Sequence, residues 1–108
     1  MRKIQKLSVL GCSVALYAMA GTVMAGVDEG KQVFVDKKCM TCHSLGDQKG
    51  AAAQLGGALD KVGSNRDADW LKGYLVDPKS KMPEAKMPKQ KLTEKELDDL
   101  VAYMLSLK

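Results

Sequence analysis

"CMTCHS", residues 39–44, places two cysteines three positions apart and a histidine directly after the second one. On a helical turn, positions i, i+3 and i+4 lie on one face, so Cys39, Cys42 and His43 are expected to project together. Three such side chains can hold a metal ion, carry out thiol chemistry or attach a cofactor. The rest of the sequence has to decide among these possibilities.

Residues 1–25 have the three parts of a secretory signal: a basic start, an apolar stretch over residues 7–20 and small residues before the cleavage point. We expect cleavage after Ala25, which leaves residues 26–108 as one domain in the periplasm of a Gram-negative-type bacterium. The alternatives are a retained membrane anchor and a lipoprotein signal ending at Cys12. The apolar run is shorter than the ~20 residues that span a bilayer, so we expect no stable membrane insertion after cleavage.

The basic charge of the chain comes largely from this predicted signal. The signal holds three of the 17 Lys and Arg residues and none of the 13 Asp and Glu residues, which leaves about +1 on the mature domain. Nucleic-acid binding needs a basic stripe or patch, so this near neutrality argues against it. With one Trp and one Phe, so small a domain cannot fill a large core, and such domains often need a metal, a disulfide or another internal support. This shortage of large apolar side chains indicates that a bulky bound group completes the core.

The mature sequence predicts three helices joined by glycine- and proline-rich loops, with no convincing strand. Asp28 is expected to cap a first helix over residues 29–39, in which Val33 and Phe34 face inward. Residues 44–66 contain five glycines and predict a loop with one short helical turn. A second helix is expected to begin at Asp67 or Asp69 and to end at Asp77-Pro78, with one apolar face made by Trp70, Leu71, Tyr74 and Leu75.

The last helix has the clearest signal. Residues 93–96 form a capping box, in which Thr93 and Glu96 satisfy each other's backbone donors. Apolar residues follow at helical spacing, namely Leu97, Leu100, Val101, Met104 and Leu107. We expect this helix to cross the first one with Tyr103 near Gly30, where the missing side chain allows close approach. Residues 79–91, between the second and last helices, contain Pro83 and Pro88 and predict irregular structure.

The spacing of Cys39 and Cys42 suits covalent attachment of a haem. The two thiols can add to its two vinyl groups, and the imidazole of His43 then reaches the iron. Cys-x-x-Cys-His is the signature of c-type haem attachment, and here it follows a predicted helix in a chain predicted to be exported. We therefore predict one covalently bound haem c with its iron.

Three other interpretations of the motif are weaker. A zinc site needs a fourth ligand, and the predicted mature chain has no further Cys or His. A thioredoxin-like redox pair is expected in a βαβ setting, and no strands are predicted. A disulfide between Cys39 and Cys42 would close only a very short loop and would cross-link no distant segments of the chain.

From Asp28 to the C-terminus, the sequence resembles the class I c-type cytochromes, in particular small bacterial monohaem cytochromes c. The resemblance implies an all-α cytochrome c fold of three to four helices around one covalent haem. It also implies that Cys39 and Cys42 carry the thioethers, that His43 is one axial iron ligand and that a methionine is the other.

Two methionines compete for the second axial position, because Met82 and Met87 each stand between a lysine and a proline. Residues before proline avoid the helical conformation, so either side chain can extend from a loop. Family sequences place a proline four residues before the ligand, as Pro83 stands to Met87, and place the ligand about six residues before the cap of the last helix. This favours Met87, with Met82 as the alternative.

Two further assignments follow from the resemblance. In the family, a carbonyl in a Gly-Pro loop holds the outer nitrogen of the histidine; here Gly57 replaces the proline, which permits the same contact in a looser loop. Trp70 resembles a residue beside the haem propionates, where Arg66 or Asn65 can join it. An ordinary core role for Trp70 is the alternative.

The predicted function is that of a monomeric periplasmic carrier that passes single electrons between redox partner proteins, and not that of an enzyme. Iron with histidine and methionine ligands has no vacancy for a substrate. Residues 79–91, which carry Met82 and Met87 and are called the methionine loop below, are rich in lysine. Lysines at the exposed haem edge would steer docking onto acidic partners; the candidates are Lys79, Lys81, Lys86, Lys89 and Lys91 in this loop, with Lys37 and Lys38 before the haem motif. The alternatives are a haem-based ligand-binding or peroxidase-like protein and a small cytochrome subunit of a larger redox enzyme.

Overall fold

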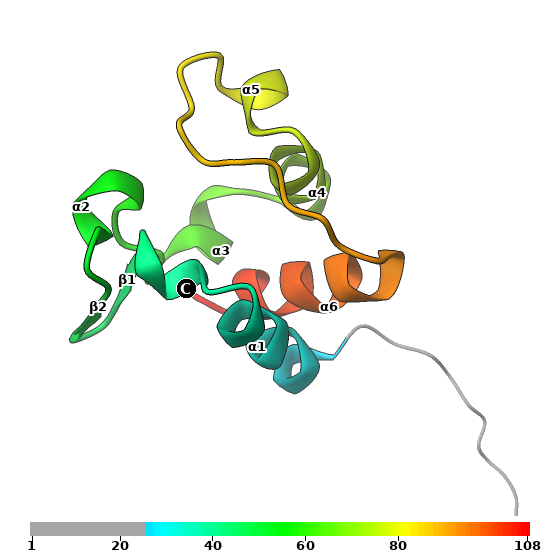
Figure 1. Cartoon of the computed structure of the whole chain (residues 1–108). Helices are drawn as coiled ribbons and strands as arrows, with labels where there is room; N and C mark the ends of the chain where they lie inside the picture. Colours follow the sequence, from blue (N-terminus) through cyan, green and yellow to red (C-terminus); the bar gives the residue numbers. More distant parts are fainter. Residues whose placement is uncertain (1–25) are drawn as a thin grey trace, which may run out of the picture.

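The computed structural model describes residues 26–108, so the predicted signal over residues 1–25 lies outside the described part. The described chain is mostly helical, as expected (Figure 1). In chain order its elements are α1 (Val27–Asp36), the 3₁₀ turn η2 (Cys39–Thr41), β1 (Ser44–Leu45), β2 (Gln48–Lys49), α2 (Ala53–Gly56), α3 (Val62–Asn65), α4 (Ala68–Val76), α5 (Pro78–Lys81) and α6 (Glu94–Leu105). The three longest helices are α1, α4 and α6, and the three others are single turns of four residues.

The fold is organised around the crossing of α1 and α6, which lie side by side at the base of the molecule (Figure 1). At the crossing, a Cβ on Gly30 would overlap the backbone carbonyl of Asp99 and lie 2.7 Å from Tyr103 Cβ. The rings of Phe34 and Tyr103 meet edge to face with 5.4 Å between centroids. The predicted contact between Gly30 and Tyr103 is therefore confirmed, and the close approach depends on the missing side chain.

Buried side chains from three helices form the core above this crossing. Val33 and Phe34 of α1 are buried as predicted, and so are Leu100, Val101 and Met104 of α6. Leu97 and Leu107 are only half-buried. Leu71 and Leu75 of α4 complete the core with 1% and 2% exposure, whereas Trp70 and Tyr74, from the same predicted face, stay half-buried at its edge.

The helix starts agree with the sequence in two cases out of three. Thr93 and Glu96 form the predicted capping box of α6, with bonds of 2.9 and 3.1 Å. Asp67, one of the two candidates, caps α4 by accepting from the Trp70 backbone N–H over 2.8 Å. The first helix, however, starts after Gly26 and not after Asp28. Asp28 instead lies in the first turn of α1, where its charge suits the positive end of the helix dipole.

The segments between the long helices differ from the predictions in three places. The first helix ends at Asp36, and Lys38 takes a left-handed conformation (φ 59°) that separates it from η2. Residues 44–49 form a two-stranded antiparallel hairpin where no strand was expected, and residues 53–65 hold two helical turns in place of one. The predicted irregular segment 79–91 begins in α5, because Pro78 at the first helical position loses no hydrogen bond there.

Within residues 26–108, no helix has both the length and the apolar character needed to cross a bilayer.

Candidate haem site

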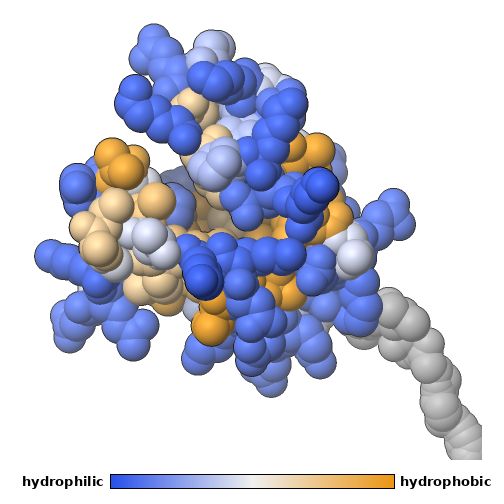
Figure 2. All heavy atoms as spheres, in the orientation of Figure 1, coloured by the Kyte–Doolittle hydropathy of each residue, from blue (hydrophilic) through white to orange (hydrophobic). Residues whose placement is uncertain are grey.

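A large cavity opens between the lower and upper parts of the fold. Its volume is about 950 Å³, at the upper end of the ~300–1,000 Å³ usual for ligand sites. Its floor includes Phe34, Leu100 and Met104, and one wall includes Leu71 and Leu75 of α4. Figure 2 shows apolar residues inside the hollow and hydrophilic residues over much of the surrounding surface. The composition predicted too few large apolar side chains to fill a core, and the cavity is the space that they leave unfilled.

The motif at residues 39–43 forms part of the cavity wall. Cys39, Cys42 and His43 all line the cavity and are half-buried, and both thiols are free. The helical turn expected for the motif is the 3₁₀ turn η2, which still brings the three side chains to one cavity. Burial raises the pKa of the Cys39 thiol above its ordinary value. Two thiols and one imidazole facing an apolar space fit a group that is both covalently attached and ligated.

The imidazole of His43 is oriented by the glycine pair at the end of α2, in which Gly56 is the last helical residue and Gly57 the C-cap. Its Nδ1 lies 3.1 Å from the carbonyl oxygen of Gly57. Because a carbonyl can only accept, this contact places the proton on Nδ1 and leaves Nε2 with a free lone pair. The carbonyl contact expected at Gly57 is confirmed, and the φ of +74° at Gly57 is closed to proline, which fixes φ near −65°. The loop therefore follows a backbone path that a Gly-Pro sequence cannot take.

Gly56, the other glycine of this pair, also packs against the imidazole, which was not predicted from the sequence. A Cβ there would lie 2.6 Å from His43 Cε1 and 2.7 Å from Nδ1, and it would overlap the carbonyl of Cys42. Any side chain at Gly56 would therefore push against the imidazole. The Gly-Gly dipeptide at 56–57 was the available signal, but only the folded loop shows which glycine touches the ring.

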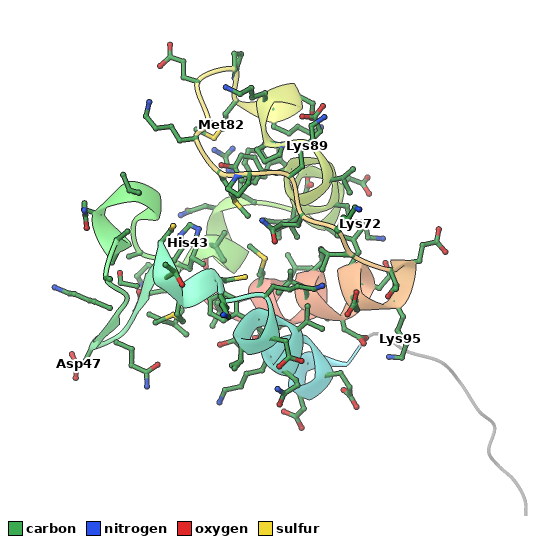
Figure 3. All side chains as sticks on the ribbon, viewed as in Figure 1. His43, Asp47, Lys72, Met82, Lys89 and Lys95 are labelled. Atoms are coloured by element: carbon green, nitrogen blue, oxygen red, sulfur yellow. The ribbon has the colours of Figure 1, made fainter. Side chains whose placement is uncertain are left out.

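Both candidate methionines line the cavity. Met87 is half-buried and packs against the hydrophobic core, whereas Met82 is 43% exposed. In Figure 3, Met82 lies on the loop above the cavity, with His43 on the opposite, lower side near η2. A hydrogen bond of 3.0 Å from Gln90 N–H to the Leu75 carbonyl ties the same loop to α4. The methionine loop is thus held over the cavity, with Met87 the better buried of the two.

Polar and aromatic side chains line another part of the cavity. The guanidinium carbon of Arg66 lies 3.9 Å from the centroid of the Trp70 ring, a cation–π contact. Trp70 also stacks on Tyr74, with 4.9 Å between centroids and 10° between planes. Asn65 lines the cavity beside them. Trp70 packs against the core and faces the cavity at once, and Tyr74, four residues further along α4, is a lining residue that the sequence analysis placed only in the core face.

Other metal chemistry has little support in the described residues. Across residues 26–108, no three His, Cys, Asp or Glu side chains are grouped so that they could hold a metal ion. Cys39 and Cys42 are not joined to each other. The described residues therefore give no structural support to the zinc and disulfide interpretations of the motif.

The sequence profile of the family described as Cytochrome c matches residues 27–108. The chain belongs to the cytochrome c family. A comparison with curated proteins gave no significant match. The matched range covers almost all of the described residues, including η2, the glycine pair, the methionine loop and α6.

Membership of the cytochrome c family confirms three of the predictions. The chain has the cytochrome c fold, it is a c-type cytochrome, and its cofactor is covalently attached haem c with iron. It also confirms the general function, which is electron transport by a haem-binding carrier that interacts with redox partners. The assignment of individual residues to the haem rests on the geometry described above.

Proposed function

We propose that the protein is a soluble periplasmic one-electron carrier whose haem iron is ligated by His43 and Met87, with thioether bonds from Cys39 and Cys42. The observation that carries this proposal is the apolar cavity, which both thiols, the imidazole and the methionine loop line together. Haem c, when bound, supplies a one-electron couple at its iron. The chain's part is to attach the group, exclude water and hold two ligands in place.

The environment of His43 supports its role as a ligand. The Gly57 carbonyl fixes the tautomer, so the nitrogen with the free lone pair is Nε2. A hydrogen bond to the outer nitrogen also raises the basicity of a ligating histidine and fixes its ring orientation. The ring also packs so closely against Gly56 that a Cβ there would lie 2.6 Å from His43 Cε1.

The better burial of Met87 supports its choice over Met82. A thioether ligand has to stay in place through each electron transfer, and a side chain packed against the core loses less entropy when it is held than an exposed one. With a histidine and a methionine as its iron ligands, the haem would have a raised reduction potential. Because the iron would then have no vacancy for a substrate, we propose a carrier and not an enzyme.

Substitution of each methionine tests this assignment. Met87→Ala should abolish the far-red sulfur-to-iron absorption band of the oxidised holoprotein. It should also lower the reduction potential and allow carbon monoxide to bind the reduced holoprotein. Met82→Ala is the matched control, since it removes the same side chain from the same loop, and should leave all three unchanged. A band that survives Met87→Ala and disappears in Met82→Ala would reverse the assignment. Tight binding of carbon monoxide by the unaltered protein would favour the ligand-binding or peroxidase-like alternative.

Arg66 and Trp70 are proposed to meet the haem propionates. Arg66 supplies a positive charge at the cavity wall, and its stacking on Trp70 holds the guanidinium plane in place. Loss of this charge in Arg66→Gln should lower the reduction potential, because a nearby cation favours the reduced, less positive iron. Lys72→Gln, which removes a surface cation paired with Asp98, is the control and should change the potential less.

The lysines of the methionine loop are proposed to steer docking onto acidic redox partners. Lys79, Lys81, Lys86, Lys89 and Lys91 are all exposed, and Lys86 lies at the cavity itself. Charges so placed raise association rates at low ionic strength and lose their effect as salt screens them. Neutralising Lys86 and Lys89 should slow electron transfer at low salt, whereas neutralising Lys31 on α1 should not. Equal rates for both variants would remove the docking role.

Residues 1–25 are proposed to direct export and to be removed after Ala25, and the mature protein is proposed to act as a monomer. Intact mass of the secreted protein reports the cleavage point and the haem together. Co-purification with a larger redox enzyme would support the subunit alternative.

A further inference from the structure

The start of the described chain lies against a buried carboxylate. The backbone N–H of Gly26 donates to Asp99 Oδ1 over 2.9 Å, which joins the beginning of α1 to the middle of α6. Asp99 is 3% exposed and is the only buried charged residue among residues 26–108. A carboxylate is costly to bury unless hydrogen bonds and opposite charge offset its lost hydration. The partners of Asp99 therefore matter for this crossing.

The charges around Asp99 are unbalanced as long as Gly26 N–H is an ordinary amide. Lys95 Nζ donates to Asp99 Oδ2 over 2.7 Å. The carboxylate of Glu29 folds back against Gly26, where an added Cβ would lie 2.7 Å from its Cδ. Asp98 pairs instead with Lys72, at 3.2 Å. The groups that contact Gly26 or its partner Asp99 are thus two carboxylates and one ammonium group, so negative charge is in excess there.

We propose that removal of residues 1–25 supplies this charge, because the new α-ammonium group of Gly26 forms an ion pair with Asp99 that fastens α1 to α6. The inference rests on the cleavage after Ala25 proposed above. Before cleavage the nitrogen is a neutral donor, and afterwards the same nitrogen carries a positive charge. The ammonium groups of Gly26 and Lys95 then both face Asp99. Processing of the chain therefore completes the contact at which the two terminal helices cross.

The dipole of α1 opposes a positive charge at Gly26, so nearby carboxylates are needed to stabilise that charge. A positive charge at the start of α1 is unfavourable, since the amino end of a helix already carries a partial positive charge. Asp99, Glu29 and the first-turn Asp28 offset this repulsion. They should raise the pKa of the amino group above the ~7.7–8.0 usual for chain termini. A raised pKa adds stability that is complete below about pH 7.7 and is lost as pH rises through the folded-state value.

The pKa of the amino group in the holoprotein tests the proposal directly. Trace labelling with acetic anhydride over a pH series, read by mass spectrometry of the amino-terminal peptide, gives this pKa. It should lie at least one unit above that of the Asp99→Asn variant, which corresponds to about tenfold less free amine at neutral pH. Asp98→Asn changes the adjacent exposed acid and should leave the value unchanged. A chain with one extra alanine before Gly26 should have an ordinary pKa, because its ammonium group is moved away from Asp99.

Each outcome decides the matter. A value within the ordinary range for the unaltered protein overturns the proposal, and so does an equal value in the alanine-extended chain. If Asp99→Asn does not fold, the comparison with the extended chain still gives the answer. An intact mass that starts at a residue other than Gly26 also overturns it. The carrier function is judged separately, by the haem spectrum of the same sample.

Discussion

Replacement of Gly56 by alanine tests how the end of α2 controls His43, the proposed iron ligand. The new Cβ would lie 2.6 Å from His43 Cε1, whereas non-bonded carbon atoms rest at about 3.5–4.0 Å. The ring or the loop must therefore move by roughly 0.9 Å or more. Such overpacking usually costs about 1–3 kcal/mol, and the hydrogen bond between His43 Nδ1 and the Gly57 carbonyl should be weakened or lost.

A glycine that does not contact His43 provides the control. Gly46, between β1 and β2, has a φ of +59°, and a Cβ there meets no atom within 4 Å. Gly46→Ala should therefore cost about 1–2 kcal/mol from backbone strain alone. The two variants should lose similar stability for different reasons, and only Gly56→Ala presses on the imidazole.

Redox potentiometry and thermal unfolding of the two holoproteins separate these effects. Gly56→Ala should raise the reduction potential, since a histidine without its carbonyl partner is a less basic ligand and stabilises the oxidised iron less. Gly46→Ala should lower the melting temperature with little change in potential. The reasoning is refuted if Gly56→Ala leaves the potential unchanged, or if Gly46→Ala shifts it by as much.

Three further predictions concern the scaffold. Gly30→Ala should destabilise the protein by about 1–3 kcal/mol in denaturant unfolding, because its Cβ would overlap the Asp99 carbonyl; a neutral effect would contradict the close crossing of α1 and α6. Thr93→Ala removes the cap of α6 and should cost about 1 kcal/mol with an unchanged haem spectrum, whereas a changed spectrum would show that the cap also acts on the site. The hydrogen bond from Lys95, aided by the Gly26 N–H, lowers the pKa of Asp99, so its contribution to stability is present above about pH 3.9 and is lost as pH falls through the folded-state value. Melting temperatures measured from pH 7 down to pH 2 should fall less in Asp99→Asn than in the unaltered chain; equal falls would exclude Asp99 as a source of the acid sensitivity.

Some parts of the structure could be predicted from the sequence because they depend only on neighbouring residues. The capping box at Thr93 and Glu96 depends on four consecutive residues, so it could be predicted without knowing the fold. The motif at residues 39–43 is equally local, because attachment chemistry fixes its spacing. The crossing at Gly30 could be predicted because a glycine within an amphipathic helix indicates close approach.

Other features depend on contacts between distant segments. The burial of Asp99 follows from the docking of Gly26, 73 residues earlier in the chain, whereas in sequence Asp99 is only an acid on a helix. Whether Met87 or Met82 is the better buried at the cavity depends on the path of a loop that Gln90 ties to Leu75. The hairpin has strands of two residues each, too short for any alternating pattern to mark them.

The most direct test of the account is the intact mass of the secreted protein, measured together with its absorption spectrum after denaturation. The account predicts a chain of residues 26–108 that is heavier than its amino acids by one haem, which stays attached in denaturant. The Cys39→Ser, Cys42→Ser double variant should lose that haem under the same conditions. A folded, colourless protein with no mass beyond its own residues would contradict the central claim.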